Sequence, residues 1–205
     1  MEEAQKRVLI LGYRGCIGYE IQLAAELAHR RCAIEVASPR GEDVPLGNGM
    51  RARADLALED IDASRYDALL LPGGDPQELV ETGSATPLLV ALASRRALIG
   101  AVCAGPIVLA KAGLLKGRRF THGYGDFHRA FLAPFWEGAE YVDAHVVEDD
   151  WLLTAQPQGT LEFAVRFAQR IGALDDAEAA YRLRYARGEV TMKESMDRAR
   201  ARGEL

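Results

Sequence analysis

The chain has 205 residues, of which 49% are hydrophobic and 27% are charged, a balance that is ordinary for a soluble globular protein. Its formal net charge of −5 argues against a general nucleic-acid or anionic-membrane surface. No apolar run approaches the roughly 20 residues that span a bilayer, and the first apolar run is too short for a signal peptide. Three cysteines without disulfide or zinc spacing favour the reducing cytoplasm. The composition therefore predicts a cytoplasmic protein that binds neither nucleic acid nor membranes.

Strand-like and helix-like segments alternate along the chain, and short apolar runs that end in glycine are typical of buried parallel strands. In chain order, the pattern predicts a strand at 8–11, a helix at 20–31, a strand at 34–37, a surface excursion at 41–56, a strand at 66–71, a helix at 87–95, a strand ending at Cys103, a helix ending at Gly113, a short strand at 118–121, two antiparallel edge strands within 141–154 and a helix at 159–172.

This alternation with short connections predicts a doubly wound, mostly parallel α/β sheet with helices on both faces, as in flavodoxin-like folds. One such domain would occupy residues 1–172. Residues 173–205 are rich in Ala, Arg and Glu, and Gly188 separates two helical stretches there. We expect this C-terminal extension to be helical, and either partly frayed or packed at a subunit interface.

The stretch from Leu98 to Pro106 is the most informative part of the sequence. An apolar run ends at Cys103, and small residues and a proline then lead into a helical pattern. A strand that turns directly into a helix around one polar atom is a nucleophile elbow. Because the helix dipole favours a thiolate, we expect the pKa of Cys103 to be lowered. A buried, inert cysteine is the alternative interpretation.

Four segments give the chain a resemblance to a known family: Leu71-Pro72-Gly73-Gly74, the elbow at 101–106, Thr121-His122 and Gln158-Gly159-Thr160. In these segments the chain resembles the ThiJ/PfpI superfamily, which includes the parkinsonism-associated deglycase and chaperone proteins. That superfamily is similar in fold to class I glutamine amidotransferases. The resemblance covers about residues 7–172. It implies the fold of that superfamily, with Cys103 as the nucleophile of the active site.

The resemblance also implies partners for Cys103. The family pairs its elbow cysteine with a glutamate after the first strand, and the matching position here is Glu20, placed with a one-residue gap. Such a carboxyl would share a proton with the thiol and have a raised pKa, although an acid in a first helical turn also complements the helix dipole. His122 matches a histidine near the elbow and is a candidate base or cation, with a structural role as the alternative.

The resemblance further implies that the backbone amides of Gly74 and Ala104 hold a substrate oxygen, and an oxyanion needs two such fixed donors. Cys16, in the loop before Glu20, is interpreted as a spectator, with a resolving thiol as the alternative. His122 and His128 have no evident third ligand, so we expect no metal site and no other cofactor. Family members are commonly dimers, which implies a homodimer here.

Departures from the family narrow the expected activity. Gln156-Pro157-Gln158 stands where amidotransferases complete their triad, and Ala104 stands where the peptidase branch has a histidine. Glutaminase and peptidase activities are therefore disfavoured. The leading hypothesis is a cofactor-free glyoxalase or deglycase for small reactive carbonyls, with Cys103 as nucleophile and Glu20 as proton shuttle. The alternatives are an isonitrile hydratase and a non-enzymatic redox sensor or chaperone that oxidises Cys103.

Overall fold

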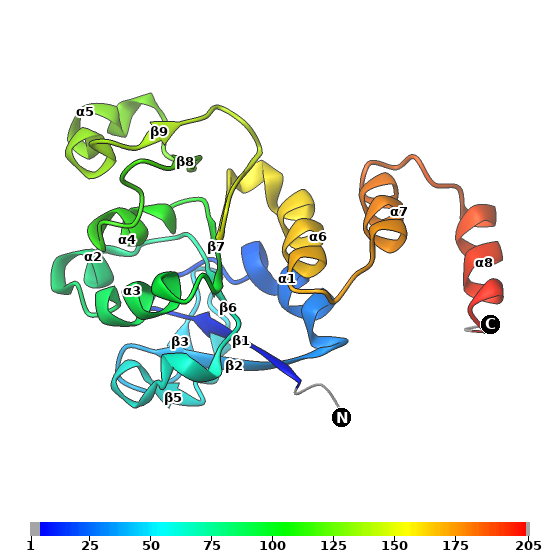
Figure 1. The fold of residues 1–205 in the computed structure, drawn as a ribbon, viewed down its shortest axis with the longest axis horizontal. Helices are drawn as coiled ribbons and strands as arrows, with labels where there is room; N and C mark the ends of the chain where they lie inside the picture. Colours follow the sequence, from blue (N-terminus) through cyan, green and yellow to red (C-terminus); the bar gives the residue numbers. More distant parts are fainter. Residues whose placement is uncertain (1–4, 204–205) are drawn as a thin grey trace.

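A central seven-stranded sheet organises the fold in a computed structural model, which describes residues 5–203 apart from the side chains of residues 129 and 130 (Figure 1). The strand order is β10-β11-β7-β6-β1-β2-β5. All neighbouring strands are parallel except β10, which pairs antiparallel with β11. The bounds are β1 Lys6–Leu11, β2 Cys32–Ser38, β5 Leu56–Ala57, β6 Ala68–Leu71, β7 Leu98–Val102, β10 Val146–Asp149 and β11 Leu152–Ala155. The doubly wound, mostly parallel α/β fold predicted from the sequence is confirmed.

Helices cover both faces of this sheet, so the core consists of two apolar layers. The layers are built on α1 Tyr19–His29 and α6 Thr160–Arg170 on one face, and on α2 Gln77–Thr82, α3 Thr86–Ser94 and α4 Pro106–Lys111 on the other. The strands are buried on both sides, which explains their continuous apolar runs. Gly100 in β7 leaves the space that Phe163 and Phe167 of α6 fill, since an added Cβ would lie 2.8 Å from the Phe163 ring.

Short elements lie outside the main sheet. They are the hairpin of β3 Val44–Pro45 and β4 Arg51–Ala52, the parallel pair of β8 Arg119–Phe120 and β9 Glu140–Tyr141, the short helix α5 Arg129–Leu132, and 3-10 turns at Leu58–Asp60, Ala63–Arg65, Asp126–His128, Ala133–Trp136 and Pro157–Gly159. The hairpin falls within the predicted surface excursion. Helix α2 was not predicted. The prediction of two edge strands is wrong for β11, because β11 lies between β10 and β7.

Two further helices follow the sheet, α7 Asp176–Ala186 and α8 Met192–Ala201, with Gly188 between them. Helix α7 buries Ala179 in the same apolar layer as α6. Helix α8 has no buried residue and lies at the far end of the molecule in Figure 1. Its attachment to α7 is therefore mainly polar. Arg198 and Arg202 donate hydrogen bonds to Glu178, and the Tyr181 hydroxyl donates to Ser195.

Candidate active site

Cys103 lies at a strained turn between β7 and α4. Its φ is +58°, a left-handed conformation that a non-glycine residue adopts at a cost of about 1–3 kcal/mol. The Cys103 N–H donates to the carbonyl oxygen of Ala155 at 2.8 Å, so β11 holds the turn in place. Gly105 has no room for a side chain, since an added Cβ would lie 2.8 Å from the carbonyl oxygen of Leu71. Backbone strain at a partly exposed cysteine is the geometry of a nucleophile elbow.

Glu20 lies in the first turn of α1 and is 1% exposed. The backbone N–H of Gly73 donates to its Oε2 at 2.7 Å. Its Oε1 is buried without an aligned hydrogen bond, and the carboxyl lies against the Cys103 thiol closely enough for each group to change the pKa of the other. The structure thus brings together Glu20 and Cys103, the two residues that the family resemblance pairs.

Burial raises the pKa of both members of this pair. Desolvation raises the pKa of the Glu20 carboxyl, although the Gly73 amide and the Cys103 thiol act in the opposite direction. Desolvation, followed by the negative charge of Glu20, raises the pKa of the Cys103 thiol to about 12. The expectation of a lowered thiol pKa is therefore wrong for a sulfur that faces an ionised Glu20. Two such coupled groups share one proton, and the thiolate forms when that proton resides on the carboxyl.

Two backbone amides point at the sulfur. Hydrogen bonds from the N–H groups of Ala104 and Gly74 lower the pKa of Cys103, against the effects of burial and of Glu20. Gly74 has a φ of +109°, a conformation that L side chains rarely adopt. An added Cβ on Gly73 would lie 2.5 Å from the Cβ of Cys103. These are the amides that the family resemblance assigns to a substrate oxygen, and both face the sulfur of Cys103.

His122 lies in an aromatic group beside the elbow. Its ring stacks on Trp136 at 5.0 Å between ring centroids and lies 4.7 Å from the ring of Tyr141. Its Nδ1 accepts the backbone N–H of Tyr124 at 3.1 Å, which requires an unprotonated Nδ1. The adjacent Gly123 faces the sulfur: its N–H donates to the Cys103 carbonyl at 2.8 Å, and an added Cβ would lie 2.9 Å from Sγ. These contacts fix the orientation of the His122 ring beside the elbow.

Two tyrosines complete the surroundings of Cys103, and the sequence analysis missed both. Desolvation raises the pKa of Tyr124 to about 12, and the charges of Cys103 and Asp75 add to the effect. The Tyr13 hydroxyl donates to the carbonyl oxygens of Pro72 and Gly73 at 2.6 and 2.8 Å. Desolvation raises the pKa of Tyr13 too. A single tyrosine in a loop carries no spacing or periodicity, so no pattern could have singled out either residue.

The other candidates lie apart from this chemistry or are inaccessible. Cys16 is 2% exposed, and burial raises the pKa of its thiol, which fits a spectator. His29, His128 and His145 are exposed. Within residues 5–203, no group of three or more His, Cys, Asp or Glu side chains is arranged to hold a metal ion. The same part of the chain contains no helix long and apolar enough to cross a membrane.

The sequence and the fold are similar to those of known proteins. The model of the DJ-1/PfpI family matches residues 6–170. The chain belongs to the DJ-1/PfpI family. The deglycase TK1284 of Thermococcus kodakarensis is 31% identical over 160 residues, which cover 74% of this chain and 90% of that one. The glutathione-independent glyoxalase DJR-1.2 of Caenorhabditis elegans is 32% identical over 133 residues, 63% of this chain and 68% of that one.

Solved structures of the DJ-1/PfpI family show the same fold. The crystal structure of Drosophila melanogaster DJ-1beta is 26% identical and superposes with a TM-score of 0.74. The match covers 89% of this chain and 97% of that structure. The family match ends at residue 170, before α7 and α8, so these two helices lie outside the region that the family model describes.

Proposed function

We propose that this DJ-1/PfpI protein is a cysteine-dependent enzyme that converts small reactive carbonyls such as methylglyoxal without an added cofactor. Cys103 is the nucleophile and Glu20 carries the proton. The observation behind the proposal is the burial of Glu20 against the elbow thiol, with its Oε2 held by Gly73. The deglycase and glyoxalase names of the relatives support this class of substrate.

The reaction begins with addition of sulfur to the aldehyde carbon. The thiol proton passes to Glu20, the C–S bond forms, and the aldehyde oxygen takes the proton from Glu20 to give a hemithioacetal. While the negative charge develops on that oxygen, the amides of Gly74 and Ala104 are placed to stabilise it. A carboxyl of raised pKa suits both the acceptance and the return of the proton.

The second half of the reaction moves hydrogen between two neighbouring carbons. Glu20 removes the proton from the hemithioacetal carbon, an enediol forms, and a proton returned to the adjacent carbon gives a thioester. Water then adds to the thioester carbonyl, the C–S bond breaks, and the sulfur regains its proton. The aldehyde carbon is oxidised and the ketone carbon is reduced, so methylglyoxal and water give lactate with no external oxidant. Repair of glyoxal-modified amines and thiols would begin with the same attack.

The test is cysteine-dependent turnover. The purified protein, a Cys103→Ser variant and a Cys32→Ala control are incubated with methylglyoxal, and lactate is quantified by mass spectrometry. We expect many lactates per protein for the wild type and the Cys32→Ala control, and none for Cys103→Ser. Absence of lactate from wild-type protein whose Cys103 still reacts with iodoacetamide would overturn the proposal. That outcome would favour the isonitrile-hydratase and redox-sensor alternatives.

A further inference from the structure

A second concave site lies at the opposite end of α1 from Glu20. It is a cavity of about 310 Å³ between the end of α1, the start of α7 and the end of α8. Its charged lining consists of four arginines and two acids: Arg30, Arg31, Arg198, Arg202, Asp175 and Glu178. Glu20 and Arg30 are ten residues apart along α1, so the two sites are separated by roughly 15 Å.

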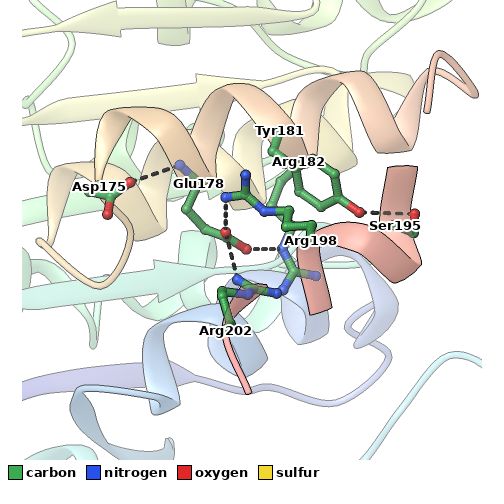
Figure 2. Close-up of polar contacts among 7 residues, drawn as sticks. All are labelled: Asp175, Glu178, Tyr181, Arg182, Ser195, Arg198 and Arg202. Atoms are coloured by element: carbon green, nitrogen blue, oxygen red, sulfur yellow. Dashed lines mark hydrogen bonds and ion pairs between the residues drawn. The ribbon is translucent and has the colours of Figure 1, made fainter. Parts of the chain in front are cut away.

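Both acids in this cavity are already engaged by neighbouring groups (Figure 2). The two oxygens of Glu178 accept hydrogen bonds from Arg182 at 2.8 Å, and from Arg198 and Arg202 at 2.6 and 2.9 Å. Oδ1 of Asp175 accepts the backbone N–H of Glu178 at 2.8 Å, which caps α7. The carboxylate of Glu178 is therefore taken up by three arginines, and one oxygen of Asp175 is taken up by the helix cap.

Arg30 and Arg31 are the remaining arginines of the cavity. Both are exposed, and among the described residues neither guanidinium makes a hydrogen bond or an ion pair. They follow the C-terminus of α1, where the negative end of the helix dipole stabilises a cation. Arg198 and Arg202, from a helix more than 160 residues further along the chain, are held at the same cavity by Glu178, so four guanidinium groups from two distant segments line it.

We propose that this cavity binds the phosphate group of a small phosphorylated molecule. Arginine presents paired N–H donors that match phosphate oxygens, and the cavity has a formal excess of two positive charges. Its volume falls at the lower end of the range for small-molecule sites, about 300–1,000 Å³. The net charge of −5 over the whole chain disfavours an extended polyanion such as nucleic acid. Glu178 holds Arg198 and Arg202 in place, while Arg30 and Arg31 supply the free donors.

The experiment measures binding of inorganic pyrophosphate to the full chain by isothermal titration calorimetry. The test variant is Arg30→Ala/Arg31→Ala, whose side chains hold no other part of the protein. The control is Arg187→Ala/Arg200→Ala, which removes the same charge from positions outside the cavity lining. We expect saturable binding of one pyrophosphate, weakened at least tenfold in the test variant and less than twofold in the control.

Three results would overturn the proposal that this cavity binds phosphate. The first is a wild-type protein that shows no saturable binding. The second is an equal loss in the test and control variants, since that would reflect net charge alone. The third is equally tight binding of citrate, because the cavity would then not select phosphate over carboxylate. Thermal unfolding of both variants without pyrophosphate confirms that each is folded, and the readout is independent of the reaction at Cys103.

Discussion

The amide of Gly73 donates to Oε2 of Glu20 at 2.7 Å and thereby fixes a carboxyl that is 1% exposed. The turn after β6 and the first turn of α1 meet at this hydrogen bond. The other carboxyl oxygen, Oε1, is buried without an aligned hydrogen bond, and the carboxyl interacts with the thiol of Cys103. An acid that served only the dipole of α1 would be solvated, so this arrangement is better explained by proton transfer with Cys103.

The shared proton predicts an unusual pH dependence for the reactivity of Cys103. Thiolate beside protonated Glu20 has the same number of protons as thiol beside carboxylate, so the fraction of the reactive form does not change between the two ionisations of the pair. We expect the rate of alkylation by iodoacetamide in the wild type to be flat between the raised pKa of Glu20 and the pKa of Cys103, which is raised to about 12. In Glu20→Gln it should instead rise about tenfold per pH unit below the pKa of the thiol.

The rates are measured on the Cys103 peptide by mass spectrometry. Glu26→Gln, an exposed position on the same helix, is the matched control and should keep the flat profile. A wild-type rate that rises with the same slope as that of Glu20→Gln would show that the thiol titrates independently of Glu20.

The absence of a side chain at residue 73 predicts a severe effect of Gly73→Ala. The new Cβ would lie 2.5 Å from the Cβ of Cys103 and 2.8 Å from both the Ala104 nitrogen and Oε2 of Glu20. The elbow must shift, and misplacement by about 1 Å can lower a rate about 100-fold. We expect kcat/KM for methylglyoxal to fall by at least that factor in a folded protein. Gly125→Ala, where an added Cβ meets nothing within 4 Å, should be close to wild type.

A positioning role for His122 is tested with His122→Phe. Phenylalanine keeps a ring to stack on Trp136 but removes the Nδ1 acceptor of the Tyr124 N–H. Loss of this hydrogen bond should cost about 1 kcal/mol, measured by urea unfolding. We expect kcat to fall by no more than about tenfold, with an unchanged pH profile, since general acid–base catalysis contributes about 100-fold or more. A drop of about 1,000-fold would instead assign proton transfer to the imidazole.

The ion pairs of Glu178 predict a loss of stability in acid. Burial opposes ionisation of this carboxyl, but hydrogen bonds from Arg198 and Arg182 outweigh it and lower the pKa. Because the folded-state pKa lies below the unfolded one, the stabilisation is present above about pH 4.5 and is lost as the pH falls through the lower folded value. Glu178→Gln should destabilise the protein by about 1–3 kcal/mol at pH 7, a difference that shrinks in acid.

Urea unfolding at several pH values measures this difference. Glu194→Gln is the control, because Glu194 pairs with Arg184 on an exposed surface where both side chains are more than 40% exposed. Its effect should stay below about 1 kcal/mol. Equal effects of the two substitutions would mean that the burial of Glu178 adds nothing to its ion pairs.

The main sheet could be predicted from the sequence because burial on both faces leaves a local signature. Residues 8–11 of β1 and the whole of β6 and β7 are apolar or glycine, and each run is followed within two residues by a glycine or by Cys103. This pattern predicted the positions of the three strands and of the elbow. The sharp turn at Cys103 could be inferred from the small residues that follow it. Glu20 required the family resemblance, since an acid in a first helical turn is common for other reasons.

The remainder depends on contacts between distant residues. Strand β8 falls within the strand predicted at 118–121, but its pairing with the two-residue strand β9, about twenty residues further along, has no local signature. The interior position of β11 depends on β10 pairing outside it, which no local pattern specifies. The raised pKa of Cys103 arises from burial and from Glu20, and both effects require the folded chain. Tyr13 and Tyr124 lie in loops that have no periodicity.

Gly73 and Gly123, which crowd the sulfur, have no side chain to vary, and the donors that face it belong to the backbone. Apart from the carboxyl of Glu20, substitutions of side chains can therefore do little to reshape the immediate surroundings of the thiol without breaking the elbow. Change can accumulate instead at Tyr124, a half-buried loop residue that lies close enough to the thiol for the charge of Cys103 to raise its pKa. Tyr13 is a poor position for change, because it is 1% exposed and its hydroxyl holds the carbonyl oxygens of Pro72 and Gly73. Directed evolution for new substrates should therefore begin at Tyr124.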